Sequence, residues 1–326
     1  MMPVYNNLVL FNPMIRQERM DTIIPELAMS WLWENGGKQL TFSLRRDVKW
    51  HDGRPFTAKD VKHTFDVVRG ASDQRLKLNP RKLWYFNVEA IVANGDYEVT
   101  FRLKRPQPSL LAILASGYSP VYPAHIAPRD IRTTAVGTGP FRLIDYKRDH
   151  LLKYRRNTDY FVKDRPYLDG IDMVIIRTRS SRMAALQANQ VDMSIPYDVD
   201  ETSKKQLAGT VPELVFDLSS SNVSDNIIMN TNRPPFDNPR LRRAVAHAVD
   251  RDRLIKLVHQ GLGIKGGAML PRPYGVWGLP EDELSDAPGM GPSATEKEKG
   301  RQIMRELGYG PNMPLNRLRK FGLSLV

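Results

Sequence analysis

The side chains that could carry out chemistry are scattered along the chain and do not form a known metal-binding pattern. No two histidines stand two or four positions apart, and no His-Glu-x-x-His motif occurs. A protein zinc site needs three or four convergent ligands, and the chain has no cysteine to supply a thiolate or form a disulfide. We therefore predict no metal site, and we expect surface or hydrogen-bonded roles for His51, His63, His125, His150, His247 and His259.

Catalytic patterns are equally weak. There is no Gly-x-Ser-x-Gly nucleophile elbow, and the absence of cysteine excludes a thiol nucleophile. Asp52 and Asp60 could be imagined as an acid–base pair, but Asp52 belongs to an Asp-Gly turn and Asp60 stands where it would cap a helix. We predict structural roles for both carboxylates, no catalytic residue and no enzymatic activity.

Two glycine clusters resemble nucleotide-binding loops only in spacing. Gly261 to Gly266 matches Gly-x-Gly-x-x-Gly, but it follows a predicted helix, whereas the dinucleotide fingerprint follows a strand. In Gly137-Thr138-Gly139-Pro140, the proline removes a backbone N–H that a phosphate loop needs. We predict a loop after a helix cap at the first cluster, a turn before a strand at the second, and no cofactor.

The stretch from Pro25 to Val68 shows the clearest local signals. Leu40, Phe42 and Leu44 alternate with polar residues, as in a half-buried strand. Asp52-Gly53 supplies a turn, and Thr57 stands three residues before Asp60 as in a capping box. The sequence predicts a strand, a turn and a helix whose apolar face carries Val61, Phe65 and Val68, with Trp50 in the core.

Further elements follow from the same patterns. A hairpin is predicted from the alternations Val88, Ala90, Val92 and Tyr97, Val99, Phe101, Leu103 around Asn94-Gly95-Asp96, and another over 141–154. A strand covered on both faces at 171–176, a helix capped by Ser180-Ser181 through Ala188 and a strand at 191–195 would form an α/β crossover. Beyond them we expect helices at 109–115, 239–249, 251–259 and 296–307, a strand at 226–230, and a buried helix face of Leu241, Val245, Ala248 and Val249.

The composition is that of a soluble globular protein, and the chain is long enough for two domains. The chain has 326 residues, of which 41% are hydrophobic and 26% charged, and no apolar run approaches the length of a membrane span. The formal charge of +12 allows a basic nucleic-acid-binding protein as an alternative. The basic residues are dispersed, without a basic block or a nucleic-acid-binding motif, and we favour solvated side chains and no nucleic-acid partner.

Two segments carry a family resemblance. Lys49-Trp50-His51-Asp52-Gly53-Arg54-Pro55, with Thr57-Ala58-Lys59-Asp60-Val61 after it and Pro25-Glu26-Leu27-Ala28-Met29-Ser30-Trp31 before it, resembles the bacterial extracellular family 5 solute-binding proteins of ABC importers. The run from Asn230 to Arg240, followed by Arg242-Arg243-Ala244 and Ala248-Val249-Asp250-Arg251, resembles the second signature of that family. The resemblance extends from about Val4 to about Pro314.

The resemblance implies an α/β, two-lobed periplasmic-binding-protein fold of type II, in the peptide-binding cluster, with an extra subdomain in lobe I. Residues 1–30 and 136–226 would form the central part of lobe I, 31–135 the extra subdomain, and 227–326 the start of lobe II. Relative to the family pattern, a secretory signal and a first strand are missing before Val4, and the resemblance fades at Leu315. We therefore expect a chain truncated at both ends, with lobe II incomplete.

The implied function is binding of a solute, an oligopeptide or dipeptide in the first instance, and its delivery to the permease subunits of an ABC importer by hinge closure in the periplasm. Residues in loops that the resemblance places near the lobe junction are the predicted ligand contacts: Tyr5, Asn6, Tyr118, Ser119, Asn226 and Asn230. The same fold could bind a sugar, an opine or a nickel chelate, and a non-functional fragment is the remaining alternative.

Overall fold

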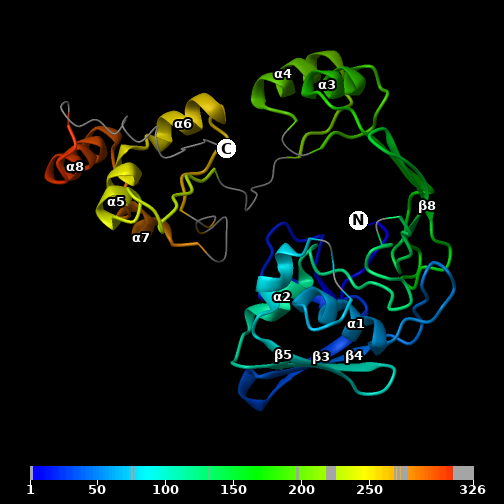
Figure 1. Cartoon of the computed structure of the whole chain (residues 1–326). Coiled ribbons are helices and arrows are strands. Elements are labelled where there is room, and N and C mark those ends of the chain that lie inside the picture. The colour runs from blue at the N-terminus through cyan, green and yellow to red at the C-terminus, as the bar shows by residue number, and fades with distance from the viewer. Residues whose placement is uncertain are drawn as a thin grey trace. The chain divides into compact units, whose positions relative to one another are not determined.

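The chain forms two compact units in a computed structural model, Met1–Arg177 and Thr178–Val326 (Figure 1). The structure describes residues 3–74, 76, 78–131, 133–195, 198–217, 225–267, 269, 272 and 278–310. Among these residues, all nine strands belong to the first unit, and the second unit contains helices and connecting segments. The predicted division into 1–30 with 136–226, 31–135 and 227–326 stays a prediction.

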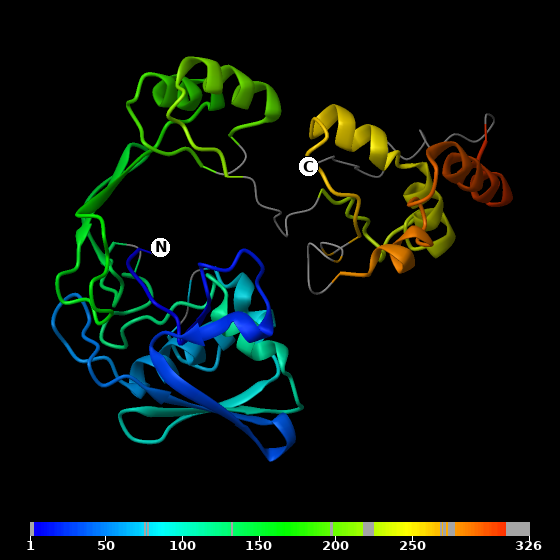
Figure 2. The ribbon, with the colours of Figure 1, turned by 180° about the vertical axis from the view of Figure 1, so that it is seen from behind.

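The core of the first unit lies between a four-stranded antiparallel sheet and two helices. The strand order is β3 (Ala28–Glu34), β4 (Gln39–Leu44), β6 (Glu98–Leu103), β5 (Val88–Ala93). Helices α1 (Ala58–Arg69) and α2 (Ser109–Ala115) lie on the same side of this sheet (Figures 1 and 2). Apolar side chains from both layers form one continuous cluster, which confirms the predicted faces of β4, β6 and α1.

The stretch around Trp50 folds as its local signals predict. Leu40, Phe42 and Leu44 of β4 are buried, and Gly53 adopts a positive φ of 88° in the turn. The backbone N–H of Thr57 donates to Asp60 Oδ2 at 2.9 Å, which completes the capping box of α1. The indole N–H of Trp50 donates to the same oxygen at 3.3 Å. Asp60 therefore caps the helix and also satisfies the buried tryptophan.

Strand β5 differs from its predicted alternation. Its register against β6 shifts between Val88 and Ala90, so that Ile91 points into the core in place of Ala90 and Val92. A β-bulge inserts one residue and reverses which side chains face inward beyond it. The strand itself was predicted correctly, but of the alternating residues Val88, Ala90 and Val92 only Val88 is buried.

A second antiparallel sheet of the first unit has the order β7 (Phe141–Lys147), β8 (Leu151–Arg156), β9 (Gly170–Val174). The short strands β1 (Val9–Phe11) and β2 (Ile23–Pro25) pair separately. The predicted hairpin over 141–154 is confirmed. The expectation that 171–176 is covered on both faces is wrong, because β9 is an edge strand and Met173 and Val174 are about half exposed, at 47% and 48%.

The second unit consists of six helices among the described residues: α3 (Arg179–Gln187), α4 (Glu201–Thr210), α5 (Pro239–Ala248), α6 (Arg251–Val258), α7 (Glu281–Ser285) and α8 (Ser293–Glu306). Helices α5 and α8 pack against each other. Asn238 caps α5 and Asp250 caps α6, as the sequence suggests. Thr178, and not Ser180-Ser181, caps α3, because its hydroxyl accepts from the Ser181 N–H.

Two predicted strands, the crossover and part of the predicted buried face of α5 are wrong in this unit. Residues 191–195 and 226–230 form no strand, since Met193, Ile195 and Ile228 are exposed and no neighbouring strand pairs with these described segments. The predicted α/β crossover is therefore absent from the part of the chain that the structure describes. On α5 Leu241 is buried as predicted, but Ala244 and His247 are buried in place of Val245 and Ala248, because α8 packs against the face that carries Ala244 and His247.

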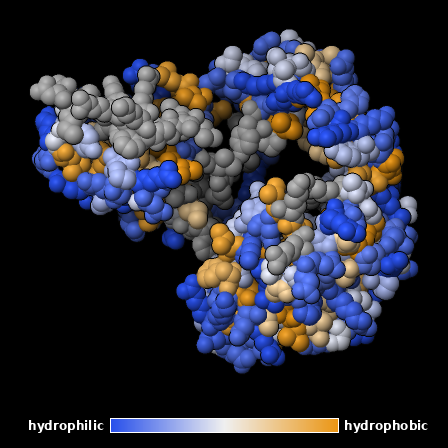
Figure 3. Space-filling model, in the orientation of Figure 1, coloured by the Kyte–Doolittle hydropathy of each residue, from blue (hydrophilic) through white to orange (hydrophobic). Residues whose placement is uncertain are grey.

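The visible surface is largely hydrophilic, with smaller hydrophobic areas between (Figure 3). Within the described helices, no segment has both the length and the apolar character needed to cross a membrane.

Candidate functional site

The N-terminal segment Pro3–Leu8 connects the four-stranded sheet with the sheet that contains β7. The carbonyls of Pro3 and Val4 accept from the N–H groups of Phe141 and Gly139 at 2.9 and 2.8 Å, and the Asn6 carbonyl accepts from Val121 at 2.9 Å. Side chains at Gly137 or Gly139 would overlap the Val4 backbone. The Gly-Thr-Gly-Pro turn is thus needed for this close approach, which agrees with its prediction as a turn before a strand.

Asn6 lies at the centre of a buried polar cluster. Its side-chain amide donates to Glu26 Oε1 at 2.6 Å and to the Tyr160 hydroxyl at 3.2 Å, and its Oδ1 accepts from Thr138 Oγ1 at 2.9 Å. The side chain therefore bonds to three residues of the protein and can hold them in place. Its role as a ligand contact stays a prediction.

Glu26 is the acidic member of this cluster. Besides the contact with Asn6, its Oε2 accepts from the Asn7 N–H at 2.7 Å. Burial raises the pKa of Glu26 to about 7, against the opposing effect of these hydrogen bonds. The carboxyl group therefore titrates close to neutral pH.

Tyr5 is buried, with its ring edge-on to Tyr122 at 5.1 Å. Its hydroxyl has no hydrogen-bond partner among the described residues, and burial raises its pKa above the ordinary value. Buried hydroxyls nearly always have a partner, so this group is a candidate for bonding to water or to a ligand. Of the predicted contacts, Tyr5 retains a free polar group.

Ser119 and Tyr118 are adjacent in the chain but differ in environment. Ser119 is buried, donates to the Ile113 carbonyl at 2.6 Å and accepts from the Tyr85 hydroxyl at 2.8 Å. Tyr118 is 66% exposed, and its ring meets Trp84 edge-on at 5.7 Å. Tyr118 can contact a ligand, whereas Ser119 helps to position Tyr118. Trp84 was missed by sequence reasoning, although the run Leu83-Trp84-Tyr85-Phe86 was a usable signal.

Asn226 and Asn230 belong to the second unit and are exposed. The Oδ1 of Asn230 accepts from the Asn232 N–H at 3.0 Å and shapes a local turn. The structure therefore brings Tyr5 and Asn6 together with the segment 118–121 in one unit and places the two asparagines in the other.

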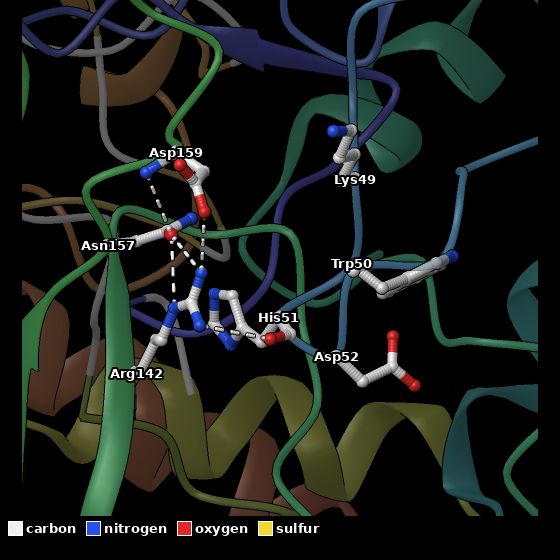
Figure 4. A pocket seen from close by; sticks show the side chains of 8 residues that line it. Lys49, Trp50, His51, Asp52, Arg142, Asn157 and Asp159 are labelled. Atoms are coloured by element: carbon white, nitrogen blue, oxygen red, sulfur yellow. Dashed lines mark hydrogen bonds and ion pairs between the residues drawn. The ribbon is translucent and has the colours of Figure 1, made fainter.

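A hollow of about 250 Å³ lies beside the turn after Trp50 (Figure 4). The Arg142 guanidinium fills one side: it donates to Asn157 Oδ1 at 2.8 Å, to Asp159 at 3.3 Å and to the His51 carbonyl at 3.1 Å. Trp50 and Asp52 point away from this group (Figure 4). Because Arg142 is already bonded within the protein, this hollow is better explained as a structural junction than as a binding pocket.

His51 completes that junction as a neutral imidazole. Its Nε2 lies 2.9 Å from the Gly139 carbonyl and must donate, while Nδ1 accepts from the Gly137 N–H at 3.3 Å. Burial, with a smaller contribution from the Arg142 charge, lowers the pKa of His51. The histidine thus ties the turn after Trp50 to the Gly-Thr-Gly-Pro turn.

A second hollow of about 470 Å³ lies between α5, α8 and the segment 285–292. Glu296 borders it and accepts from His247 Nδ1 and the Gly289 N–H, each at 2.6 Å, and from Lys299 at 2.8 Å. Lys299, with His247, holds the pKa of Glu296 at about 2. His247 is thus a hydrogen-bonded buried histidine. No group of three potential metal ligands converges among the residues that the structure describes.

Comparison with known proteins gives consistent matches. The chain is 30% identical to heme-binding protein A of Haemophilus influenzae over 95% of its length and 28% identical to the dipeptide-binding protein of Escherichia coli over 94%. It spans 57% and 58% of these two relatives. Among solved structures, it matches the periplasmic binding protein DppA of Helicobacter pylori in complex with the peptide STSA, at 25% identity and a TM-score of 0.78, over 94% of this chain and 60% of that one.

These matches confirm the predicted α/β, two-lobed periplasmic-binding-protein fold. The family model "Bacterial extracellular solute-binding proteins, family 5 Middle" matches residues 22–324. That range includes both signature segments, around Trp50 and around Asn238. The chain therefore belongs to the family 5 bacterial extracellular solute-binding proteins.

Proposed function

We propose that this protein binds a small peptide and delivers it to the permease of an ABC importer. The supporting observation is the family match, together with relatives named for dipeptides and for di- and tripeptides at 28% identity. The chain spans less than two thirds of those relatives, so the activity of the longer proteins enters here as a proposal.

Two of the predicted residues in the first unit offer groups to such a solute: the hydroxyl of Tyr5, which has no partner among the described residues, and the exposed ring of Tyr118. Asn226 and Asn230 are the proposed contacts from the second unit. Asn6 and Ser119 act through their neighbours, because their own polar atoms are bonded inside the protein. Main-chain pairing and water-mediated contacts would let one site accept peptides of differing side chains.

The protein performs no chemistry on its ligand in this proposal. The solute shifts the population toward a closed form by binding it more tightly, and that form is the one presented to the permease. The family description is extracellular, and we place this chain in the periplasm on that basis. We assign its dispersed basic residues to the solvated surface, and we expect no nucleic-acid partner.

Native mass spectrometry of protein purified without refolding tests this function. A spread of bound masses that match short peptides, released on denaturation, is the expected result. Added di- and tripeptides should also raise the melting temperature in proportion to the logarithm of their concentration above Kd. A single bound non-peptide mass, such as a sugar, an opine or a nickel chelate, would contradict the peptide assignment. Aggregated protein without any ligand would indicate a non-functional fragment.

Heme is a second candidate, because a relative at 30% identity is named a heme-binding protein. It predicts a Soret absorption band in the purified protein or after titration with hemin. Competition separates the candidates: a peptide ligand should be displaced by other peptides, and a porphyrin should not.

A further inference from the structure

Two large aromatic side chains stand exposed side by side on the first unit. Trp84 belongs to the 3₁₀ helix Pro80–Tyr85 and is 40% exposed, and Tyr118 in the loop after α2 is 66% exposed. Their rings meet edge to face, with centroids 5.7 Å apart and planes at 85°. Leu83 and Phe86 are also exposed beside Trp84 in the chain. The local surface is therefore more apolar than solubility requires.

The pair is held by a second pair directly beneath it. Tyr85 follows Trp84, Ser119 follows Tyr118, and the Tyr85 hydroxyl donates to Ser119 Oγ at 2.8 Å inside the core. Ser119 in turn donates to the Ile113 carbonyl at 2.6 Å, so its acceptor role toward Tyr85 is settled. This buried bond fixes the spacing of the 3₁₀ helix and the loop, and so of the two exposed rings.

A further hydrogen bond joins the two segments, because the Arg81 guanidinium donates to the Tyr118 carbonyl. The Tyr118 backbone is therefore held beside one positive charge, in an arrangement already formed without a ligand. A preformed aromatic surface loses little conformational entropy when a partner binds, which favours its use in recognition.

We propose that Trp84 and Tyr118 form a subsite for the apolar side chain of a peptide solute, with aromatic side chains preferred and cationic ones disfavoured by Arg81. The inference rests on the proposed peptide-binding function and adds a basis for side-chain preference. Edge-to-face geometry leaves one ring face of the pair able to pack on a third ring. Trp84 is the specificity-determining residue of this subsite, and Tyr85 and Ser119 are positioning residues.

Isothermal titration calorimetry on the full chain, with Ala-Phe, Phe-Ala, Ala-Leu, Ala-Ala and Ala-Lys as probes, tests the subsite. We expect one of the phenylalanine peptides to bind about tenfold tighter than Ala-Ala, and Trp84→Ala to reduce that ratio to near one while Ala-Ala affinity stays within about twofold. Trp84→Phe should retain most of the preference. Tyr167→Ala, which removes another exposed aromatic side chain, is the matched control and should change nothing.

The outcomes separate the two proposals. If peptides bind but Trp84→Ala leaves the phenylalanine preference unchanged, or weakens all peptides equally, the subsite is wrong and the peptide function stands. If no probe binds wild type while hemin or another solute does, the peptide function is wrong, and the subsite falls with it. Thermal melts of each variant guard against unfolding, and loss of the ligand-induced change in tryptophan fluorescence in Trp84→Phe gives an independent readout.

Discussion

Different kinds of internal contact stabilise the two units of this protein. In the first unit, aromatic and aliphatic side chains from the four-stranded sheet, α1 and α2 form a continuous apolar cluster that includes Phe42, Trp50 and Phe101. In the second unit, buried carboxylates organise the contacts. Asp198 takes two hydrogen bonds from Arg182 at 2.6 and 2.7 Å, and Glu296 takes three from its neighbours.

This contrast predicts which substitutions and which pH changes should destabilise each unit. Apolar packing depends on shape and volume and is indifferent to pH, so the first unit should respond most to truncation of core side chains. A carboxylate that accepts several hydrogen bonds must stay ionised, so the second unit should respond to charge removal and to acid. The first unit also has carboxyl groups away from solvent: Asp60, which is buried and accepts from Trp50 and Thr57, and the part-buried Glu26. The environment of Glu26 shifts its pKa in the opposite direction to that of Glu296.

The largest effect is expected from Phe42→Ala. Phe42 is completely buried and packs edge-on to Phe101, so its loss leaves a cavity that costs about 3–5 kcal/mol of unfolding free energy. Hydrogen exchange followed by mass spectrometry should show lost protection over residues 28–103 and unchanged protection over 239–306. Leu32→Ala, in the same hairpin but 61% exposed, is the control and should cost less than about 0.5 kcal/mol. Equal loss in both units would show that they unfold as one.

Glu26 should make the first unit less stable as the pH rises. Its folded pKa of about 7 lies above the ordinary value of 4.5, so the folded state holds the proton more tightly than the unfolded chain. Its contribution is therefore most favourable below pH 4.5 and is lost as pH rises through 7, by up to about 3 kcal/mol.

Urea unfolding between pH 5 and 8 measures this slope. Glu26→Gln should flatten it, and Glu18→Gln, at an exposed position, should leave it in place. A slope that is unchanged in Glu26→Gln would assign the pH dependence to other groups.

In the second unit, Glu296→Gln should cost about 2 kcal/mol, since the three hydrogen bonds to the ionised carboxylate become neutral or are lost. The pH dependence has the opposite sign to that of Glu26: the folded pKa of about 2 lies below 4.5, so the stabilisation is present above pH 4.5 and is lost as pH falls toward 2. Exchange protection over 239–306 is the readout. Glu298→Gln removes an exposed ion pair of the same helix and should have almost no effect.

The smallest expected effect is the difference in stability between two tyrosine variants of the first unit. Tyr85→Phe removes a satisfied hydrogen bond to Ser119 and should cost about 1 kcal/mol. Tyr5→Phe removes a hydroxyl without a partner among the described residues and should cost nothing or stabilise slightly. Thermal unfolding of both variants is the measurement. A clear loss in Tyr5→Phe would mean that its hydroxyl bonds to an internal water.

The sequence by itself determined the local elements whose signals lie within a few residues. The strand with Phe42, the Asp52-Gly53 turn, the capping box of Thr57 and Asp60, and the helix start at Asn238-Pro239 are all confirmed, because each depends on neighbouring backbone and side-chain groups. The family could be recognised from the sequence for the same reason, because its signatures are short runs of consecutive residues.

Only the tertiary structure decided what depends on contacts between distant segments. Burial at 171–176, pairing at 191–195 and 226–230, and the inward face of β5 were predicted wrongly, since alternation in a sequence does not say whether a partner strand or helix lies against it. The site shows the same limit. Asn6 and Ser119 looked like ligand contacts, but Glu26 and Tyr85, distant along the chain, occupy their polar atoms, while Tyr118 stays exposed and gains Trp84 as a neighbour because the bond between Tyr85 and Ser119 draws their two segments together.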